Sequence, residues 1–361
     1  MKKIITLLSL ISVSLIYGQD GAPANPYYNG FNWNQTGTAL KNALATKITT
    51  THTKELTYSQ VWEALKITDL DPQNSANVLL VYGWEDGSDS NVTNDRSRDK
   101  DNNGGSNGQW NREHIFAQAL GNPSLGQIGP GADAHMLRSC DVQRNGTRDN
   151  RLFAAGSGNS TTIGSNNWYP GDEWKGDVAR ILMYMYLHYG TQCLPTYVTS
   201  GTTATTDSNM PNLLLEWNAE DPVSQYEDNR NTYLGGTPSS SNFKQGNRNP
   251  FIDNPYLATV IWGGPIAQNR WPNVFLSNAE FNFENSISVY PNPSNDGTIN
   301  ITTEANLDEI NVISVNGQLM QQIKKPISIH TNYSVSNLPK GFYFLQLNSN
   351  NQSVTKKIVI N

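Results

Sequence analysis

A change of composition near residue 285 of the 361 constrains the fold of this chain more than any other feature. The residues after it contain neither Trp nor Cys, although the whole chain holds 9 Trp. Short alternating runs separated by Asn-Gly and Pro-Lys-Gly turn signals fill this region: SISVYPNP, TINIT, EINVISVNGQ, GFYFLQLN and VTKKIVIN. The pattern predicts a small all-β sandwich over residues 286–361, distinct from the rest of the chain.

The N-terminal segment has the features of a targeting sequence. Two lysines precede an apolar stretch from Ile4 to about Tyr17, which ends at the small residue Gly18. A basic start and a short apolar core are typical of a secretory signal peptide, and the stretch is short for a membrane span. We expect residues 1–18 to be a signal peptide and the protein to be exported. No second hydrophobic span follows, so we expect no stable membrane span.

Between these segments, the sequence pattern of residues 19–280 predicts one α+β domain that is mostly helical. Apolar residues in 171–190 recur at helical spacing, and SQVWEALKIT at 59–68 has the same periodicity with Ser59 or Thr57 as its cap. SANVLLVYGW at 75–84 reads as a buried strand. Helices and strands therefore alternate irregularly in the domain that we expect to carry the chemistry.

Charge and cysteine content limit the partners and the compartment. The net charge is −6, and removal of the two signal-peptide lysines takes the mature chain to −8. This argues against a stoichiometric nucleic-acid binder, which needs clustered Lys and Arg, but not against an enzyme that contacts a polyanion briefly. Cys140 and Cys193 are the two cysteines, and an exported pair is more often bridged than free. The sequence leaves open whether the two sulfurs meet.

Three short groups in the central domain could carry chemistry: Glu113-His114, Asp133-x-His135, and the segment from Asn145 to Asn150. Zinc sites usually take close ligand pairs such as H-x-x-x-H or C-x-x-C, and neither pattern is present. A serine hydrolase would need G-x-S-x-G, which is also absent. These two classes are therefore disfavoured.

A hard divalent cation fits these residues better. Mg²⁺ keeps several waters and takes one or two protein oxygens, which the Glu113 carboxylate and the Asn145 amide could supply. His114 could then act as general base on an attacking water, while the metal stabilises charge on the phosphate and the leaving oxygen. Neighbours in a regular strand point to opposite faces, so we expect Glu113 and His114 at a strand end or a bulge.

The C-terminal segment resembles the sorting domain of proteins exported by the type IX secretion system. VYPNP at 289–293, the L-P-K-G-F-Y run at 338–343 and the closing KKIVIN carry the resemblance over about 75 residues. It implies the type IX machinery as a partner. It also implies export across an outer membrane, after which the protein is secreted or attached to the cell surface.

The central domain resembles the endonuclease I family. WNREHIF at 110–116 is similar to that family's W-x-x-E-H, and residues 133–153 are similar to its D-x-H-N-L and N-G-x-R-S-N motifs. KGDVARILMYM and QGNRNPFID are similar to later signatures, so the resemblance spans about residues 30–265. It implies a ββα-metal (His-Me finger) core and a secreted, Mg²⁺-dependent, sequence-nonspecific endonuclease. DNA is the expected substrate, and RNA is a further candidate.

Carried over by motif position, the resemblance implies His114 as general base and Glu113 with Asn145 as ligands of Mg²⁺, in whose place Mn²⁺ or Ca²⁺ could bind. Arg148 and Arg138 are further candidate catalytic residues that contact phosphate, as Arg112 could. Each arginine could equally form a structural ion pair with a nearby aspartate. The sequence departs from the family at Met136, Cys140 and Asp149, and none of these departures removes a proposed ligand or the proposed base.

Two residues and one competing function stay open. His135 either orients a neighbour of the site or is a satisfied buried histidine. Asn150 competes with Asn145 as ligand, although the motif favours Asn145. The competing function is a non-catalytic, secreted calcium-binding or adhesive surface protein that uses the acidic loop 85–101. Within this loop DKDNNG at 99–104 matches half of a calcium loop, but Trp110 stands where that loop needs Glu.

Overall fold

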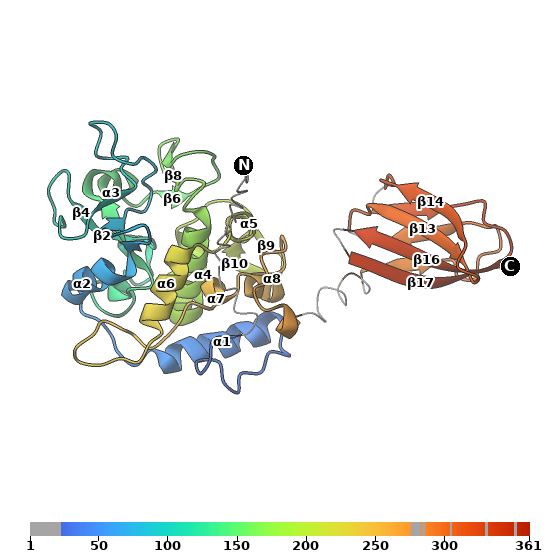
Figure 1. Ribbon diagram of the computed structural model, residues 1–361, viewed down its shortest axis with the longest axis horizontal. Helices are drawn as coiled ribbons and strands as arrows, with labels where there is room; N and C mark the ends of the chain where they lie inside the picture. The colour runs from blue at the N-terminus through green and yellow to red at the C-terminus, as the bar shows by residue number, and fades with distance from the viewer. Residues whose placement is uncertain (1–22, 276–282, 284–285, 304, 329–330, 350–351) are drawn as a thin grey trace, which may run out of the picture. The chain divides into compact units, whose positions relative to one another are not determined.

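The structure is a computed structural model that describes residues 23–275, 283, 286–303, 305–328, 331–349 and 352–361. The chain divides into two compact units, with the boundary between Trp271 and Pro272 (Figure 1). The expected signal peptide, residues 1–18, lies outside the described residues. None of the helices described is long and apolar enough to cross a membrane.

The N-terminal unit is built mainly from helices. Its α-helices are α1 Gly37–Thr51, α2 Tyr58–Thr68, α3 Val142–Arg148, α4 Lys175–Tyr189, α5 Asn212–Glu220, α6 Gln225–Leu234, α7 Pro250–Asp253 and α8 Tyr256–Trp262. Short 3₁₀ turns occur at η1 Gln118–Leu120, η2 Gly129–Ala132, η3 Gly190–Cys193 and η4 Pro195–Tyr197.

The strands of this unit are short and form small sheets. They are β1 Leu70–Asp71, β2 Asn74–Leu79, β3 Ser97–Asp99, β4 Trp110–His114, β5 Leu137–Asp141, β6 Leu152–Phe153, β7 Thr161–Ile163, β8 Asn167–Tyr169, β9 Thr203–Ala204 and β10 Asp207–Pro211. The sheet orders are β1-β2-β3, β4-β5, β6-β8-β7 and β10-β9. The strand expected at 75–84 therefore ends at Leu79, although Leu80, Val81 and Tyr82 remain buried.

Helix α4 is the core of this unit. Every residue from Gly176 to Leu187 is buried, as expected for a helix covered on all sides. Helices α1, α5 and α7 pack against it, and β4 and α3 lie together away from α5 and α8 (Figure 1). The helix predicted at 171–190 is confirmed, with its first turn at Lys175.

Local capping fixes where two of the helices begin. Thr57 caps α2, because its side chain accepts a hydrogen bond from the Gln60 N–H while the Gln60 side chain accepts one from the Thr57 N–H. Ser224 and Glu227 form the same reciprocal pair at the start of α6. Of the two caps expected for α2, Thr57 is the one that forms.

The C-terminal unit contains strands β11 Ser288–Tyr290, β12 Ile299–Thr302, β13 Glu309–Ser314, β14 Leu319–Lys324, β15 Asn332–Val335, β16 Gly341–Ser349 and β17 Gln352–Ile360. The sheet orders are β11-β12-β15 and β14-β13-β16-β17. Alternate residues of β16, Tyr343, Leu345 and Leu347, enter one apolar cluster that also holds Ile299 and Ile301 of the other sheet. A strand-rich unit follows the helical one, so the predicted α+β class is confirmed.

Candidate active site

The motif residues predicted to carry chemistry lie in a strand pair followed by a short helix. β4 pairs antiparallel with β5 in an unbroken register that sets His114 opposite Leu137. α3 begins directly after β5, because the Asp141 carboxylate accepts hydrogen bonds at 2.9 Å from the N–H groups of Gln143 and Arg144. α3 packs back against β4, so segments that are separated in sequence meet at one place.

Glu113 and His114 are the last two residues of β4. The register with β5 shows no irregularity, so the pair sits at a strand end, one of the two places expected for it. The Glu113 residue is only 2% exposed, whereas the His114 residue is partly exposed. The carboxylate is therefore the inner group of the pair, and the ring is the one that water can reach.

The imidazole of His114 is held from two sides. Its ring stacks on Tyr58 with centroids 5.6 Å apart, and its Nε2 lies 3.0 Å from the carbonyl oxygen of Gly131. A carbonyl only accepts hydrogen bonds, so Nε2 carries the proton and Nδ1 keeps its lone pair. Burial lowers the pKa of His114 to about 4, against the Gly131 bond and with the help of two arginine charges. The ring is neutral near pH 7, and its Nδ1 can accept a proton.

Glu113 is a buried carboxylate, and its contacts offset only part of the cost of burying its charge. Its Oε1 accepts a hydrogen bond of 2.9 Å from the Tyr82 hydroxyl and lies 3.5 Å from Nη1 of Arg148. Burial raises the pKa of Glu113 to about 7, although Arg148 and Tyr82 oppose the rise. The ionised form is therefore costly here, and a bound cation would offset that cost.

Asn145 is oriented by hydrogen bonds to β4. Its Nδ2 donates to Oδ1 of Asn111 at 2.8 Å and to the carbonyl of Arg112 at 3.4 Å. The bond to the Arg112 carbonyl sets which end of the amide is nitrogen, because a backbone carbonyl only accepts hydrogen bonds. Within the described part of the chain, no donor reaches the Asn145 side-chain oxygen, which is thus available as a ligand alongside the Glu113 carboxylate.

Arg148 lies beneath the site. Its side chain is 1% exposed, and it donates from Nη1 to the carbonyl of His114 at 3.1 Å and from Nη2 to the carbonyl of Ile115 at 2.9 Å. The guanidinium therefore fixes the backbone where β4 ends. It also supplies positive charge near Glu113.

Arg138 does not lie at the site formed by Glu113, His114 and Asn145. It is fully buried, donates from Nη2 to Asp177 at 2.8 Å, and has its guanidinium carbon 4.7 Å from the centre of the Tyr226 ring. A group enclosed in this way cannot meet a polymer phosphate, so the contact expected from its sequence position is wrong. Its ion-pair partner is on α4, not in the segment near the motif where an aspartate partner was expected.

Arg112 is partly exposed, and its guanidinium packs on two aromatic rings. Its guanidinium carbon lies 3.5 Å from the ring centre of Tyr58 and 4.2 Å from that of Trp62. Tyr58 therefore contacts both Arg112 and His114, which share one face of β4 because they are two residues apart. This face presents a cation beside the imidazole.

The residues left open by the sequence have defined places. His135 is buried, and its Nε2 lies 3.0 Å from the carbonyl oxygen of Asn247, so it is a satisfied interior histidine. Asn150 is exposed and lies beyond the end of α3. Cys140 and Cys193 are both buried free thiols, so the bridge left open above is not formed.

Three groups that shape the site gave no signal in the sequence. Tyr58 comes from the start of α2, Tyr82 follows β2, and the Gly131 carbonyl belongs to η2. Tyrosine and glycine are too common for single residues to be informative. Tyr82 lies in the predicted strand segment 75–84, but the direction of its hydroxyl toward Glu113 depends on tertiary packing.

Comparison with known proteins matches both units. Residues 36–256 fit the family model described as endonuclease I, and residues 288–361 fit the model described as a secretion system C-terminal sorting domain. The chain is 43% identical over 238 residues to an extracellular ribonuclease of Bacillus amyloliquefaciens, which covers 63% of this chain and 75% of the relative. It is 40% identical over 267 residues to an extracellular ribonuclease of Bacillus subtilis (strain 168), which covers 71% of this chain and 84% of the relative.

Proposed function

The chain belongs to the endonuclease I family, and from this premise we propose that β4, β5 and α3 form a ββα-metal site that hydrolyses phosphodiester bonds of DNA and RNA in the presence of Mg²⁺. The protein is a nuclease, and its sorting domain makes it secreted or bound at the cell surface. The competing class of a non-catalytic surface protein is thereby set aside. RNA is included because both relatives are named as extracellular ribonucleases.

The observation that carries the mechanism is the 3.0 Å contact between Nε2 of His114 and the Gly131 carbonyl. It commits the proton of the neutral ring to Nε2 and leaves the Nδ1 lone pair free. His114 removes a proton from a water at Nδ1, the water oxygen attacks phosphorus, and the bond between phosphorus and the leaving ester oxygen breaks. The leaving oxygen takes up a proton from solvent, and His114 later returns its own proton to solvent. Tyr58 limits rotation of the ring, and Arg148 holds the peptide that bears it.

Glu113 and Asn145 fit a hard divalent cation. Their side chains offer oxygen atoms only, and the two ligands they supply suit an ion that keeps several waters. The buried carboxylate of Glu113, which receives one hydroxyl donor, and the free amide oxygen of Asn145 both support a cation at this place. Such an ion, when bound, stabilises negative charge on the phosphate and on the leaving oxygen. Mn²⁺ or Ca²⁺ would use the same oxygen donors.

The arginines divide between two roles in this proposal. Arg112 contacts the substrate phosphate, since its guanidinium reaches the face of β4 that carries His114. Arg148 acts on the reaction through the backbone of His114 and through the charge of Glu113. Substrate contact by Arg138 is not part of the mechanism.

The two family matches also support a division of the chain into a catalytic domain and a sorting domain. We assign residues 1–18 to a signal peptide, 19–280 to the catalytic domain and 286–361 to the sorting domain recognised by the type IX secretion machinery. Loss of the last segment should block export without changing cleavage in a purified protein.

Purified protein incubated with plasmid DNA or with RNA tests the function. Cleavage should occur with Mg²⁺ and stop with excess EDTA, and His114→Ala should reduce the rate at least about 10²-fold because it removes the base. The folded state of the variant is checked by its thermal unfolding. Full activity of folded His114→Ala would contradict the mechanism. Rates on duplex DNA, single strands and RNA rank the substrates.

A further inference from the structure

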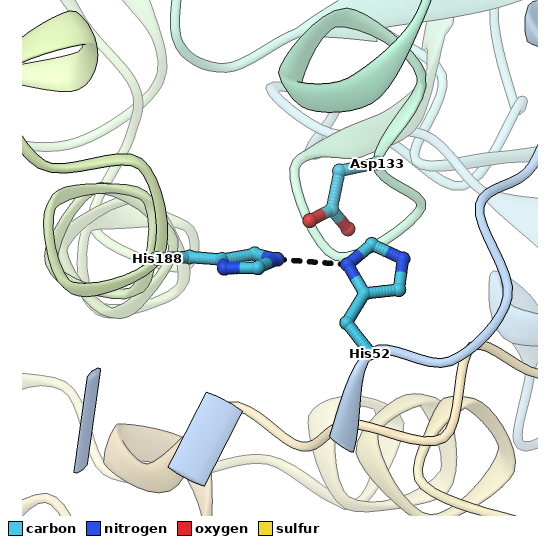
Figure 2. Close-up of side chains that lie close together, drawn as sticks. All are labelled: His52, Asp133 and His188. Atoms are coloured by element: carbon cyan, nitrogen blue, oxygen red, sulfur yellow. Dashed lines mark hydrogen bonds between the residues drawn. The ribbon is translucent and has the colours of Figure 1, made fainter. Parts of the chain in front are cut away.

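A second group of metal-ligating side chains shares no residue with the proposed catalytic site. His52 follows the end of α1, Asp133 follows η2, and His188 lies in the last turn of α4. One ligand atom of each lies within 4.8 Å of the others. Figure 2 shows the three side chains converging from three separate segments.

The two imidazoles of this group aim at the same point. Nδ1 of His52 and Nε2 of His188 are 2.7 Å apart, a hydrogen-bond distance, so one proton lies between two nitrogen lone pairs (Figure 2). The other nitrogen of His188 lies 3.3 Å from Oγ1 of Thr49, to which it can donate. That hydrogen bond leaves Nε2 of His188 with the lone pair that accepts the shared proton, and this is the lone pair that a metal would use.

Asp133 supplies the carboxylate of the group, and its donors hold it in place. Its Oδ2 accepts hydrogen bonds from the hydroxyls of Tyr184 at 2.7 Å and Tyr189 at 2.9 Å. Its Oδ1 accepts from the His135 N–H at 2.8 Å and from the Gln245 amide at 3.0 Å. A ligand carboxylate is usually oriented by such hydrogen bonds from surrounding residues, and one of these donors would yield its place to the ion.

We propose that His52, Asp133 and His188 bind a transition-metal ion of the Zn²⁺ class, which takes the place of the proton shared by the two rings. Imidazole nitrogen selects Zn²⁺ and its neighbours, whereas the all-oxygen pair Glu113 and Asn145 selects Mg²⁺. Two imidazoles and one carboxylate leave a fourth position for water, and both rings are partly exposed, so an ion can enter.

The distances define the rearrangement that binding requires. Metal–nitrogen bonds of about 2.0–2.1 Å in a tetrahedral site keep ligand atoms about 3.3 Å apart. The two nitrogens, now 2.7 Å apart, must therefore separate by about 0.6 Å, and the carboxylate must close a gap of at most 4.8 Å to the same spacing. The geometry seen here is the proton-bridged form of the site.

A metal at this place would tie the η2 segment to the ends of α1 and α4. Asp133 is two residues from Gly131, whose carbonyl accepts the hydrogen bond from His114. The ion would therefore restrain the segment that orients the proposed base. This consequence for activity rests on the proposed function, whereas metal binding itself does not.

Metal content and thermal unfolding of the mature protein test the site. Protein is stripped with EDTA, incubated with Zn²⁺, passed over a desalting column and analysed for metal. The wild type should retain one more Zn²⁺ per chain than the double variant His52→Gln/His188→Gln. Zn²⁺ should raise the Tm of the wild type on the order of 5 °C above its value in EDTA, and should not raise that of the variant.

The controls separate metal binding from folding and from catalysis. Thr49→Val removes a hydrogen bond to His188 but keeps all three ligands, so it should retain the extra Zn²⁺. His188→Gln alone serves if the double variant does not fold, and each Tm is compared with that of the same protein in EDTA. Equal metal content in the wild type and the histidine variants would overturn the site. A nuclease assay on the same samples reports the proposed function independently.

Discussion

Glu113 and Glu227 are equally hidden from water, yet their surroundings differ. Glu227 is 0% exposed and receives two hydrogen bonds from Arg180, at 2.6 and 2.8 Å. Glu113, at 2% exposed, has one tyrosine hydroxyl and a guanidinium at 3.5 Å. A matched cation makes the first carboxylate part of the framework. The Glu113 carboxylate, at the end of β4, has no cation matched as closely among the described residues. It is therefore the buried charge that a bound cation can neutralise.

His114 and His135 also share a local environment but differ in what their surroundings allow. His114 and His135 each have Nε2 at 3.0 Å from a backbone carbonyl oxygen and a tyrosine ring beside the imidazole. His135 is enclosed at 1% exposed, whereas His114 is partly open. The same tautomer is therefore inert in the interior and useful at the strand end. Access to water, rather than hydrogen bonding, distinguishes the base from the structural residue.

The sharpest test of this comparison is Glu113→Gln. Loss of the charge that holds the cation should reduce the rate of cleavage about 10³-fold or more. Stability in EDTA should stay the same or rise, because burial already raises the pKa of Glu113 to about 7 and the neutral amide avoids that cost. Initial rates on plasmid DNA and urea unfolding measure the two effects.

Glu173→Gln is the matched control. Its side chain is 41% exposed and pairs with Arg96 at the surface, so both rate and stability should remain within error. If Glu113→Gln instead lost stability and kept its rate, the contrast drawn between the two buried glutamates would be reversed.

The second largest effect should come from Glu227→Gln. The substitution leaves Arg180 buried without a matched charge, and breaking such a pair costs about 3 kcal/mol. The free energy of unfolding should fall by that amount, while cleavage per folded molecule stays unchanged. Loss of activity at full stability would mean that α6 contributes to the reaction.

The motif residues and the larger elements could be predicted from the sequence, because they depend on local order. The helix at 171–190 follows from apolar spacing, and the strand-end position of His114 follows from the need to aim two adjacent side chains at one site. The predicted phosphate contact of Arg138 is wrong, because the burial of this side chain depends on Asp177, 39 residues away on another element. The contact of His52 with His188 spans 136 residues and leaves no periodic trace. Sequence patterns record local geometry, whereas these contacts depend on tertiary packing.

Asp221 is an intermediate case between the two glutamates. Burial raises its pKa to about 6 despite the charge of Arg180 and a hydrogen bond from the Gly176 N–H. A carboxyl with a raised folded pKa adds stability at low pH, and that stability is lost as pH rises through about 6. Relative to Asp221→Asn, the wild type should therefore lose roughly 2 kcal/mol between pH 4 and pH 7. Urea unfolding of both proteins at pH 4 and pH 7 measures this loss. If the difference in the free energy of unfolding between wild type and Asp221→Asn were the same at both pH values, Asp221 would not be an intermediate case.

The smallest effect is expected from Tyr82→Phe, which removes the one hydroxyl that stabilises Glu113 and leaves the ring in place. Its 2.9 Å hydrogen bond to Oε1 should be worth about 1.5 kcal/mol, because a bond to a buried carboxylate exceeds a typical neutral one while the substitution leaves no new cavity. Glu113 would then depend more on a bound cation. The concentration of Mg²⁺ for half-maximal cleavage should accordingly rise several-fold, while the maximal rate changes little. Titration of activity with Mg²⁺ separates the two quantities. A lower maximal rate with unchanged Mg²⁺ dependence would show that Tyr82 acts on the substrate and not on the carboxylate.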